Sequence, residues 1–206
     1  MSGSQRAGSF NTMLLEAARV RLMTEGAAGC EVVDLAALEL PIYSQDIEAT
    51  GMPPAAVALK EKLTNATGFV ICCPEYNGLP TPLLLNALTW ATRGDGDMYA
   101  GFKGKIASLL STSPGPMGGL RMQRIMSAML RDMGTVLIPG HVALGGSTKI
   151  FDKTGALVDD VAHAKVEALC GQLMHFARFD ANRDKNDCIV KMIKQQKLVG
   201  EYGALE

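Results

Sequence analysis

Short apolar runs that alternate with helical patterns limit the fold of this sequence more than any other feature. The run GFVICC (residues 68–73) is continuously apolar and rich in β-formers, the pattern of a strand buried on both faces of a parallel sheet. Further strands are predicted at residues 31–34, 103–113 and 135–140, and helices at residues 11–25, 55–63, 80–94, 118–134 and within 155–181. This alternation predicts βαβ units, and therefore an α/β fold whose parallel sheet is covered by helices on both faces.

The composition fits a single soluble domain. The chain has 206 residues, of which 48% are hydrophobic and 20% are charged, and its formal net charge is −1. We predict one domain over residues 1–181, followed by a polar C-terminal arm at 182–206. The near-neutral charge gives no electrostatic reason to expect a nucleic acid or an anionic membrane as partner.

The sequence carries no targeting or metal-binding pattern. No segment reaches the ~20 apolar residues of a membrane span and no signal-peptide pattern is present, so we expect a cytoplasmic location. The five cysteines are an odd number without metal-ligand spacing, which predicts neither a disulfide framework nor a metal site. The three histidines form no triad signature with a serine or cysteine.

The loop GSQRAGSFN (residues 3–11) stands directly before a predicted helix. Its glycines let backbone amides approach an anion, Ser4 and Ser9 add hydroxyl donors, and Arg6 can pair with a phosphate. The helix N-terminus adds a partial positive charge. The loop lacks the Gly-Lys-Ser/Thr ending of a Walker A loop and the GxGxxG dinucleotide pattern, but it predicts a phosphate site.

Two more loops lie between a predicted strand and the helix that follows it. In PEYNGLP (residues 74–80), Tyr76 offers a flat apolar face, while Asn77 and Gly78 permit a backbone path that brings amides to the edge of a planar ligand. In SPGPMGGLR (residues 113–121), the dense glycines indicate a backbone that passes close to a neighbour. Parallel sheets bind ligands beyond the carboxyl ends of their strands, so we expect these loops to lie side by side.

Together, GSQRAGSFN, PEYNGLPTPLLLNALTW and SPGPMGGLR resemble the three signatures of the NADPH-dependent FMN reductase family. That family includes flavin, quinone, chromate and azo-dye reductases with a flavodoxin-like fold. The stretch DLAALELPIYSQDIE is similar to the family's second strand and the loop after it. The resemblance covers residues 2–142, in the order and spacing of the family.

The resemblance implies an FMN site built from all three loops. The FMN phosphate would be held by Ser4, Arg6, Ser9 and Asn11. The isoalloxazine ring would be bordered by Pro74, Glu75, Tyr76, Asn77 and Gly78, with backbone amides near its N5 and O4 edge. The other side of the ring, with the entry for nicotinamide, would be closed by Ser113, Pro114, Gly115, Gly118, Gly119 and Arg121.

The resemblance also implies a doubly wound sheet of five parallel strands in the order 2-1-3-4-5. In that order the first strand is central and leads directly into the phosphate loop, so Met1 would be at best its last residue. A typical strand has about five or six residues. We therefore expect about that many strand residues upstream of the given sequence.

Two positions depart from the pattern of many family members. Leu85 stands where many relatives have lysine, and Thr89 stands where they often have aspartate. Family members use this helix for dimer contacts, so the resemblance implies a homodimer or homotetramer without deciding between them.

The activity implied by the resemblance is that of an FMN-containing oxidoreductase with NADPH or NADH as co-substrate. It would pass electrons by ping-pong hydride transfer to a small acceptor such as a quinone or free flavin, and flavin N5, not a side chain, would carry the hydride. Two other classes stay open: a flavodoxin-type electron carrier, although carriers usually have a strongly acidic surface, and a flavin-free binding module with the same fold. Reduction by NAD(P)H would exclude the carrier, and a yellow protein would exclude the flavin-free module.

Overall fold

A parallel β-sheet forms the central layer of the structure. The structure is a computed structural model that describes residues 1–181, so the arm predicted at 182–206 lies outside the described residues. The sheet of the described residues has four strands: β1 (Gly68–Cys72), β2 (Ile106–Thr112), β3 (Val136–Leu137) and β4 (Val142–Leu144). β1 pairs with one edge of β2, and β3 and β4 both pair with the other edge, all in parallel. The prediction of an α/β fold with a parallel sheet is confirmed.

The strands are the most apolar segments of the chain, and burial follows that pattern. β2 is buried along its whole length, and β1 is buried at every residue except the first. β3 and β4 follow one another along β2, separated by a break that contains Pro139 and Gly140. The strand predicted at residues 135–140 is only partly right. Val136–Leu137 pairs with β2, and Ile138 N–H still donates to the carbonyl of Ala107 at 3.0 Å, but the pairing stops at Pro139, because proline has no N–H to donate to a ladder.

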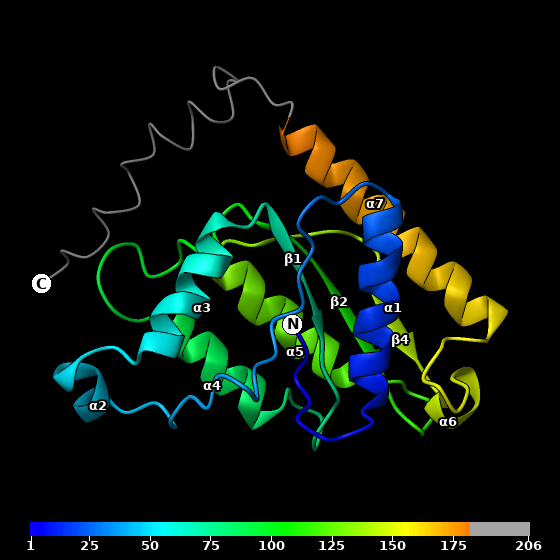
Figure 1. The fold of residues 1–206 in the computed structure, drawn as a ribbon, viewed down its shortest axis with the longest axis horizontal. Coiled ribbons are helices and arrows are strands. Elements are labelled where there is room, and N and C mark those ends of the chain that lie inside the picture. The colour runs from blue at the N-terminus through cyan, green and yellow to red at the C-terminus, as the bar shows by residue number, and fades with distance from the viewer. Residues whose placement is uncertain (182–206) are drawn as a thin grey trace, which may run out of the picture.

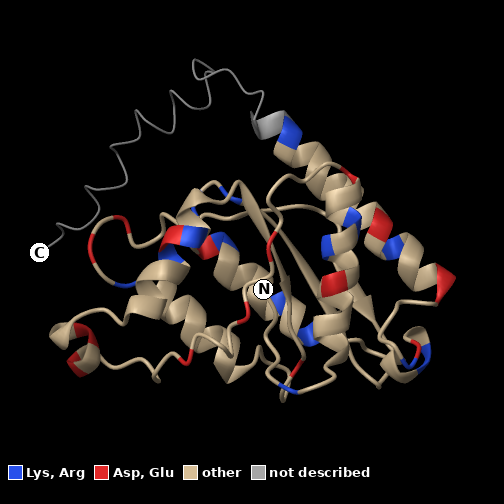
Figure 2. Ribbon diagram, viewed as in Figure 1, with Lys and Arg blue, Asp and Glu red and all other residues tan. Residues whose placement is uncertain are grey.

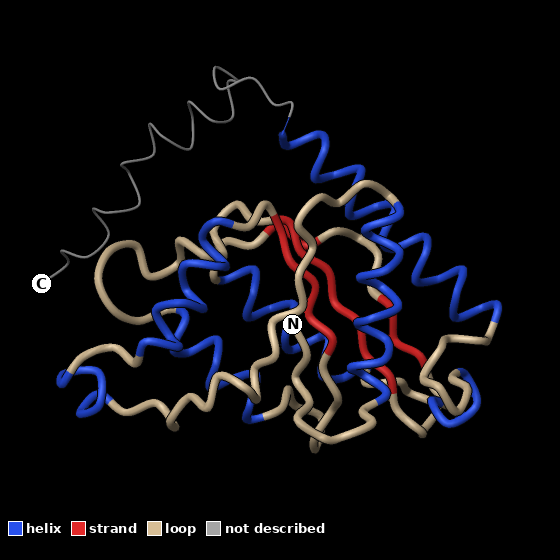
Figure 3. Tube along the Cα trace, in the orientation of Figure 1, coloured by secondary structure: helices blue, strands red, loops and turns tan. Residues whose placement is uncertain are grey.

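Helices cover both faces of the sheet, as Figure 1 and Figure 3 show. One face is covered by α1 (Phe10–Thr24) and α7 (Asp160–Ala181), and the other by α3 (Pro54–Asn65), α4 (Pro82–Ala91) and α5 (Leu120–Asp132). The five predicted helices are confirmed, with their ends moved by a few residues. Two short helices, α2 (Gln45–Thr50) and α6 (Ser147–Ile150), lie where no helix is predicted, because one or two turns carry too little periodicity to detect.

Two hydrophobic cores lie on opposite faces of β1. Val70 and Cys72 belong to the core shared with α1 and α7, whereas Phe69 and Ile71 belong to the core under α3, α4 and α5. This division follows from the alternation of side chains along a strand. Charged residues lie on the helices and loops and leave the strands free of charge (Figure 2). No helix among residues 1–181 is long and apolar enough to cross a membrane.

Residues 1–3 run parallel to β1 along its open edge. Cys72 N–H donates to the carbonyl of Met1 at 3.1 Å, and Gly3 N–H donates to the carbonyl of Cys72 at 2.8 Å. The amino group of Met1 donates to the carbonyl of Val70 at 2.7 Å. This short segment leads the chain directly into the first predicted loop.

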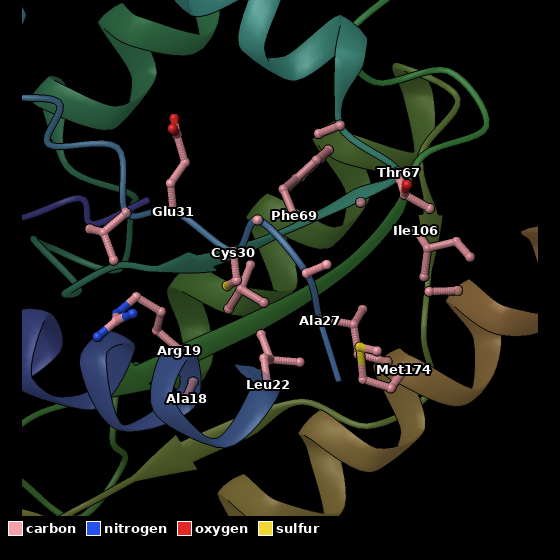
Figure 4. Close-up of a pocket in the computed structure, with 18 of the residues that line it drawn as sticks. Ala18, Arg19, Leu22, Ala27, Cys30, Glu31, Thr67, Phe69, Ile106 and Met174 are labelled. Carbon is pink, nitrogen blue, oxygen red and sulfur yellow. The ribbon is translucent and has the colours of Figure 1, made fainter. Parts of the chain in front are cut away.

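A cavity of about 530 Å³ lies beside the other half of β1. Met1 borders it, Phe69 and Ile106 line its sheet side, and Leu22 of α1 and Cys30 line the side opposite (Figure 4). By the alternation of backbone groups along a strand, the N–H of Val70 and both backbone groups of Gly68 face this cavity. The unpaired edge of β1 therefore borders an apolar space.

The strand predicted at residues 31–34 is wrong. These residues have no partner in the sheet, and residues 31–33 line the far side of the cavity from β1. A strand requires hydrogen bonds to a neighbouring backbone, and residues 1–3 pair only with the carboxyl half of β1. The sheet of residues 1–181 thus lacks the first two of the five predicted strands, and it has four strands because β3 and β4 lie where one last strand was predicted to end.

Candidate functional site

The three glycine-containing loops lie together at the carboxyl ends of the strands. The first loop (residues 3–11) leads into α1, the second (residues 74–80) joins β1 to α4, and the third (residues 113–121) joins β2 to the first turn of α5. In Figures 1 and 3 these connections run along the lower edge of the sheet. The predicted convergence of the loops is thus present in the fold.

Hydrogen bonds tie the first loop to each of the other two. The Thr81 hydroxyl, just after the second loop, donates to the carbonyl of Gly3 at 2.6 Å. Asn11 binds the end of β2, where the third loop begins: its Nδ2 donates to the carbonyl of Thr112 at 2.9 Å, and its Oδ1 accepts the N–H of Thr112 at 3.0 Å. Both contacts hold the first loop at a fixed distance from its neighbours.

The serine hydroxyls of the first loop keep a hydrogen free to donate. Ser9 caps α1, and its Oγ accepts the N–H of Thr12 at 3.4 Å. Ser4 Oγ likewise accepts the N–H of Arg6 at 3.4 Å. A hydroxyl that accepts from the backbone can still donate its own hydrogen to a ligand.

The start of α1 adds positive potential to the same place. Within the described residues, the backbone N–H groups of Phe10 and Asn11 have no hydrogen-bond acceptor, as is usual in the first turn of a helix. The guanidinium of Arg6 lies over the Phe10 ring, 5.6 Å from its centroid, and makes no ion pair with the described carboxylates. Amides, hydroxyls and one guanidinium are the groups that bind a phosphate.

The second loop is a tight hairpin turn. Tyr76 and Leu79 exchange two backbone hydrogen bonds of 2.9 Å each, and the residues between them have positive φ angles, 54° at Asn77 and 84° at Gly78. Positive φ at both central positions is the geometry that favours Asn-Gly. The N–H groups of Asn77 and Gly78 donate to no described acceptor, and Tyr76 is 53% exposed, so the turn presents both donors and an aromatic ring. Pro74, at the start of the loop, is half-buried.

The glycines of the third loop are packed against backbone. A Cβ on Gly118, whose φ is +59°, would lie 2.6 Å from backbone atoms of Leu144. A Cβ on Gly119, whose φ is +88°, would lie 2.8 Å from the side chain of Ser111. The prediction that these glycines allow a close approach of the backbone is thus confirmed. The neighbours are Leu144 and Ser111 of the same chain.

The outer part of the third loop rests on residues 144–147, which sequence reasoning missed. Ser113 N–H donates to the carbonyl of Leu144 at 3.1 Å, and Ser147 N–H donates to the carbonyl of Ser113 at 3.0 Å. A Cβ on Gly145 would lie 2.6 Å from the carbonyl oxygen of Pro116. Pro114 and Gly115 remain exposed on the outside. The Gly-Gly pair after the last strand was the available signal for this support.

Glu75 and Arg121, both predicted to contact the cofactor, contact each other. Glu75 Oε1 accepts the Nε–H of Arg121 at 2.6 Å, and Glu75 Oε2 accepts the backbone N–H groups of Arg121 and Met122 at 3.1 and 3.3 Å. Burial raises the pKa of Glu75, but Arg121 and the two amides together lower it by more than burial raises it. The pKa of Glu75 therefore lies below its usual 4.5. The carboxylate is therefore ionised at neutral pH and joins the second loop to the third.

The site offers no activated nucleophile. Burial raises the pKa of the Cys72 thiol well above its usual value and that of Cys73 as well. Burial, followed by the charge of Arg131, lowers the pKa of His141, which keeps this imidazole neutral just before β4, where it lies beside Ser127 of α5. The chemistry that the three loops can support is the binding of an anionic group and of a flat ring edge through backbone and hydroxyl donors.

Comparisons with known proteins agree with this geometry. A model of the family described as NADPH-dependent FMN reductase matches residues 1–149. An NAD(P)H-dependent FMN reductase of Pseudomonas aeruginosa is 32% identical over 169 residues, which are 81% of this chain and 87% of that protein. A quinone reductase of Escherichia coli is 31% identical over 181 residues, covering 86% of this chain and 91% of that one. Among solved structures, the flavoenzyme NAD(P)H:(acceptor) oxidoreductase FerB of Paracoccus denitrificans has a TM-score of 0.72 at 26% identity, with 85% of this chain and 95% of that chain covered.

Proposed function

The chain belongs to the NADPH-dependent FMN reductase family, and on that premise we propose that its three loops hold FMN between them. It is an NAD(P)H-dependent oxidoreductase with FMN as its cofactor. The convergence of an anion-binding helix start with a donor-rich hairpin turn is the observation that supports this placement. A phosphorylated flat ring is complementary to such a pair of surfaces.

The phosphate end lies in the first loop. Ser4, Arg6 and Ser9 would contact the phosphate through their side chains, and the backbone N–H groups of Phe10 and Asn11 would complete its shell. The side-chain amide of Asn11 is hydrogen-bonded to Thr112 and holds the loop in place, so Asn11 would bind the phosphate through its backbone N–H.

The ring end lies between the second and third loops. The N–H groups of Asn77 and Gly78 would face the polar edge of the ring, and Pro74 and Tyr76 would border it. The other side would be closed by Ser113, Pro114, Gly115, Gly118 and Gly119. FMN held there would supply a hydride-accepting centre for NAD(P)H and a donor of electrons to a second substrate. The side chains around it bind and orient the ring, since they include neither an activated thiol nor an unpaired carboxylate.

We propose that the second substrate is a quinone, free flavin or a similar small acceptor, which replaces the nicotinamide on the same ring face in a ping-pong cycle. The relatives from Escherichia coli and Paracoccus denitrificans carry the names quinone reductase and NAD(P)H:(acceptor) oxidoreductase. The exposed Tyr76, Leu79 and Met117 at the mouth of the site provide apolar surface for such acceptors. A cytoplasmic homodimer or homotetramer with contacts through α4 is the assembly we propose.

The complete sheet, on this proposal, has five strands in the order 2-1-3-4-5. A strand in the cavity beside β1 would continue the line of residues 1–3 and would bring a hydrogen-bond partner to residues 31–34. Residues 1–181 would then form the FMN-binding domain, with 182–206 as an appended arm.

The phosphate placement is tested by titrating the apoprotein with FMN and with riboflavin, which lacks the phosphate. We expect Arg6→Gln to weaken FMN binding about tenfold, because it removes a charged donor, and to leave riboflavin binding unchanged. Lys153→Gln, which removes an exposed cation from another loop, is the matched control. Equal effects of Arg6→Gln on both flavins would reject the phosphate role of Arg6.

The redox activity is tested by anaerobic stopped-flow mixing of the FMN-loaded protein with NADPH and with NADH. We expect rapid bleaching of the oxidised flavin absorbance, followed by recovery when a quinone is added. A flavin that stays oxidised with both nucleotides would favour the electron carrier. An apoprotein that takes up no flavin would favour the flavin-free binding module.

A further inference from the structure

We propose that Glu75 is a positioning residue that braces the second loop against the start of α5, and that Arg121 completes this brace without contacting cofactor or nucleotide. The proposal rests on the FMN site described above. It assigns the two residues to each other, although both stand in stretches that resemble cofactor-binding signatures. The brace would fix the relative position of the second and third loops, which form the two walls of the ring site.

The Glu75 carboxylate has no capacity left for a ligand. It accepts three hydrogen bonds, from the backbone N–H groups of Arg121 and Met122 and from Nε of the Arg121 guanidinium, and one terminal nitrogen of that guanidinium is in ion-pair contact with Oε1. An ionised carboxylate has about four lone-pair positions for hydrogen bonds. The Glu75 side chain is only 9% exposed, whereas that of Arg121 is 66% exposed. Glu75 is thus enclosed by its partners, and Arg121 closes over it from the solvent side.

The brace uses the electrostatics of a helix N-terminus. Gly119 caps α5 and offers no side-chain oxygen to the first-turn amides. Glu75, which lies 46 positions earlier in the chain, supplies that oxygen from another loop. A carboxylate at the N-terminus is favoured by the helix dipole, and Arg121 adds an opposite charge. The second loop is therefore the cap of α5.

The place of Glu75 in the chain connects this cap with the ring donors. Tyr76, Asn77 and Gly78 follow it directly, and the closely packed Gly118 and Gly119 precede α5. Fixing Glu75 on α5 fixes the distance between the turn at residues 76–79 and the glycines opposite. A site whose walls are fixed before binding loses less conformational entropy when the ligand binds.

The brace differs in kind from the other two ties between the loops. The contacts of Thr81 with Gly3 and of Asn11 with Thr112 are hydrogen bonds between neutral groups. The contact of Glu75 with Arg121 is an ion pair with charge-assisted hydrogen bonds. Only the brace should therefore respond to neutralising substitutions.

The test compares FMN binding with nucleotide use in Glu75→Gln, Arg121→Gln and the double variant. Arg121→Gln leaves Glu75 on the amides of α5, which protects folding, and Glu75→Gln keeps an oxygen to accept them. We expect each single variant to raise the dissociation constant of FMN about tenfold. The double variant should have a dissociation constant no higher than the higher of the two single variants, because both substitutions remove the same interaction. The KM for NADPH and for NADH should change less than about twofold, a result expected if Arg121 contacts no nucleotide.

Two further variants sharpen the result. Glu16→Gln breaks an exposed ion pair with Arg19 on α1 and should leave FMN binding unchanged. Arg121→Lys retains the charge and should recover part of the lost affinity. Far-UV circular dichroism and thermal unfolding of each apoprotein show that the variants are folded.

Three results would overturn the proposal. Unchanged FMN binding in Glu75→Gln would reject the role of the brace, but it would not reject the FMN site. A tenfold rise in the KM for NADPH in Arg121→Gln, at constant FMN affinity, would show that Arg121 contacts the nucleotide. Failure of the wild-type apoprotein to bind FMN would instead reject the proposed site itself, and the brace of that site with it.

Discussion

At the scale of single residues, Gly118 has the least freedom of the glycines in the third loop. It combines a positive φ of +59° with backbone atoms of Leu144 only 2.6 Å from the place of a Cβ. Gly96 has a similar φ of +84° but open space around it. A substitution at Gly96 therefore tests the cost of a left-handed conformation alone, and one at Gly118 adds the cost of steric overlap.

We therefore predict different effects of alanine at these two glycines. Gly96→Ala should lower the free energy of unfolding by about 1 kcal/mol, the cost of the left-handed region alone. Gly118→Ala should lower it by more than about 3 kcal/mol, because backbone must also move, and should weaken FMN binding. Urea unfolding of both apoproteins measures the difference, and equal losses would contradict the packing of the third loop.

Glu75 predicts a pH dependence with a definite sign. Burial raises its pKa, and Arg121 with two amides lowers it more, leaving it below the usual 4.5. A carboxyl with a lowered pKa in the folded state contributes stability above its unfolded pKa and loses it as the pH falls through the folded pKa. The advantage of the wild type over Glu75→Gln in free energy of unfolding should be constant at neutral pH and shrink below pH 4.5. An advantage that grows below that pH would contradict the ion pair.

Local chemistry is what made single residues predictable. Asn77 and Gly78 were recognisable because their residue types suit positive φ, which the structure confirms. Thr81, Gly145 and the pairing of Glu75 with Arg121 were not recognised, because their partners are distant in the sequence: Thr81 binds Gly3 and Glu75 binds a residue 46 positions away. A sequence pattern shows which residue can make a contact, but only the fold shows which distant residue is its partner.

At the scale of elements, Asn11 joins α1 to β2. Its side chain is buried and makes two hydrogen bonds of 2.9 and 3.0 Å to the backbone of Thr112, 101 positions away. No other side chain of the first loop spans such a distance in sequence within the described residues. The placement of the phosphate loop over the sheet therefore depends on this amide together with the contacts of Gly3 with Cys72 and Thr81.

We predict that Asn11→Ala lowers the free energy of unfolding by about 2 kcal/mol or more, because it leaves a buried N–H and a buried carbonyl of Thr112 without partners. Asn65→Ala, at the exposed end of α3, should change it by less than about 0.5 kcal/mol. Chemical denaturation with matched m-values measures both. A small effect of Asn11→Ala would show that α1 is held by its apolar face alone.

Elements with their own periodicity were predicted well, and those that depend on a partner were not. α1, α3, α4, α5 and α7 carry apolar faces, and β1 and β2 are short apolar runs, so each could be located from its own sequence. The strand predicted at residues 31–34 has a suitable composition but no neighbour to pair with. Strand formation depends on a second segment, which local composition does not reveal.

At the scale of the whole molecule, the cavity beside β1 borders the half of that strand's edge that has no pairing partner among residues 1–181. It has a volume of about 530 Å³ and apolar walls that include Leu22, Phe69 and Ile106. Residues 1–3 end at its border while pairing in parallel with β1. Its position, along an unpaired strand edge, fits an extended chain better than a compact ligand.

We predict that five β-branched apolar residues placed before Met1 raise the free energy of unfolding by at least about 2 kcal/mol, because they bury apolar side chains and pair with β1. Five glycine and serine residues of equal length form the control. Hydrogen exchange should show new protection at Val70 with the apolar segment only. Equal stability of the two extended proteins would contradict a strand position in the cavity.

The central claim is that the three loops at the carboxyl ends of the strands meet around one FMN. A crystal structure of the protein with FMN tests it most directly. The phosphate should lie within hydrogen-bond distance of the amides of Phe10 and Asn11, and the ring edge should face the amides of Asn77 and Gly78. A flavin bound in the cavity at the amino ends of the strands, or on any surface outside the three loops, would contradict the claim.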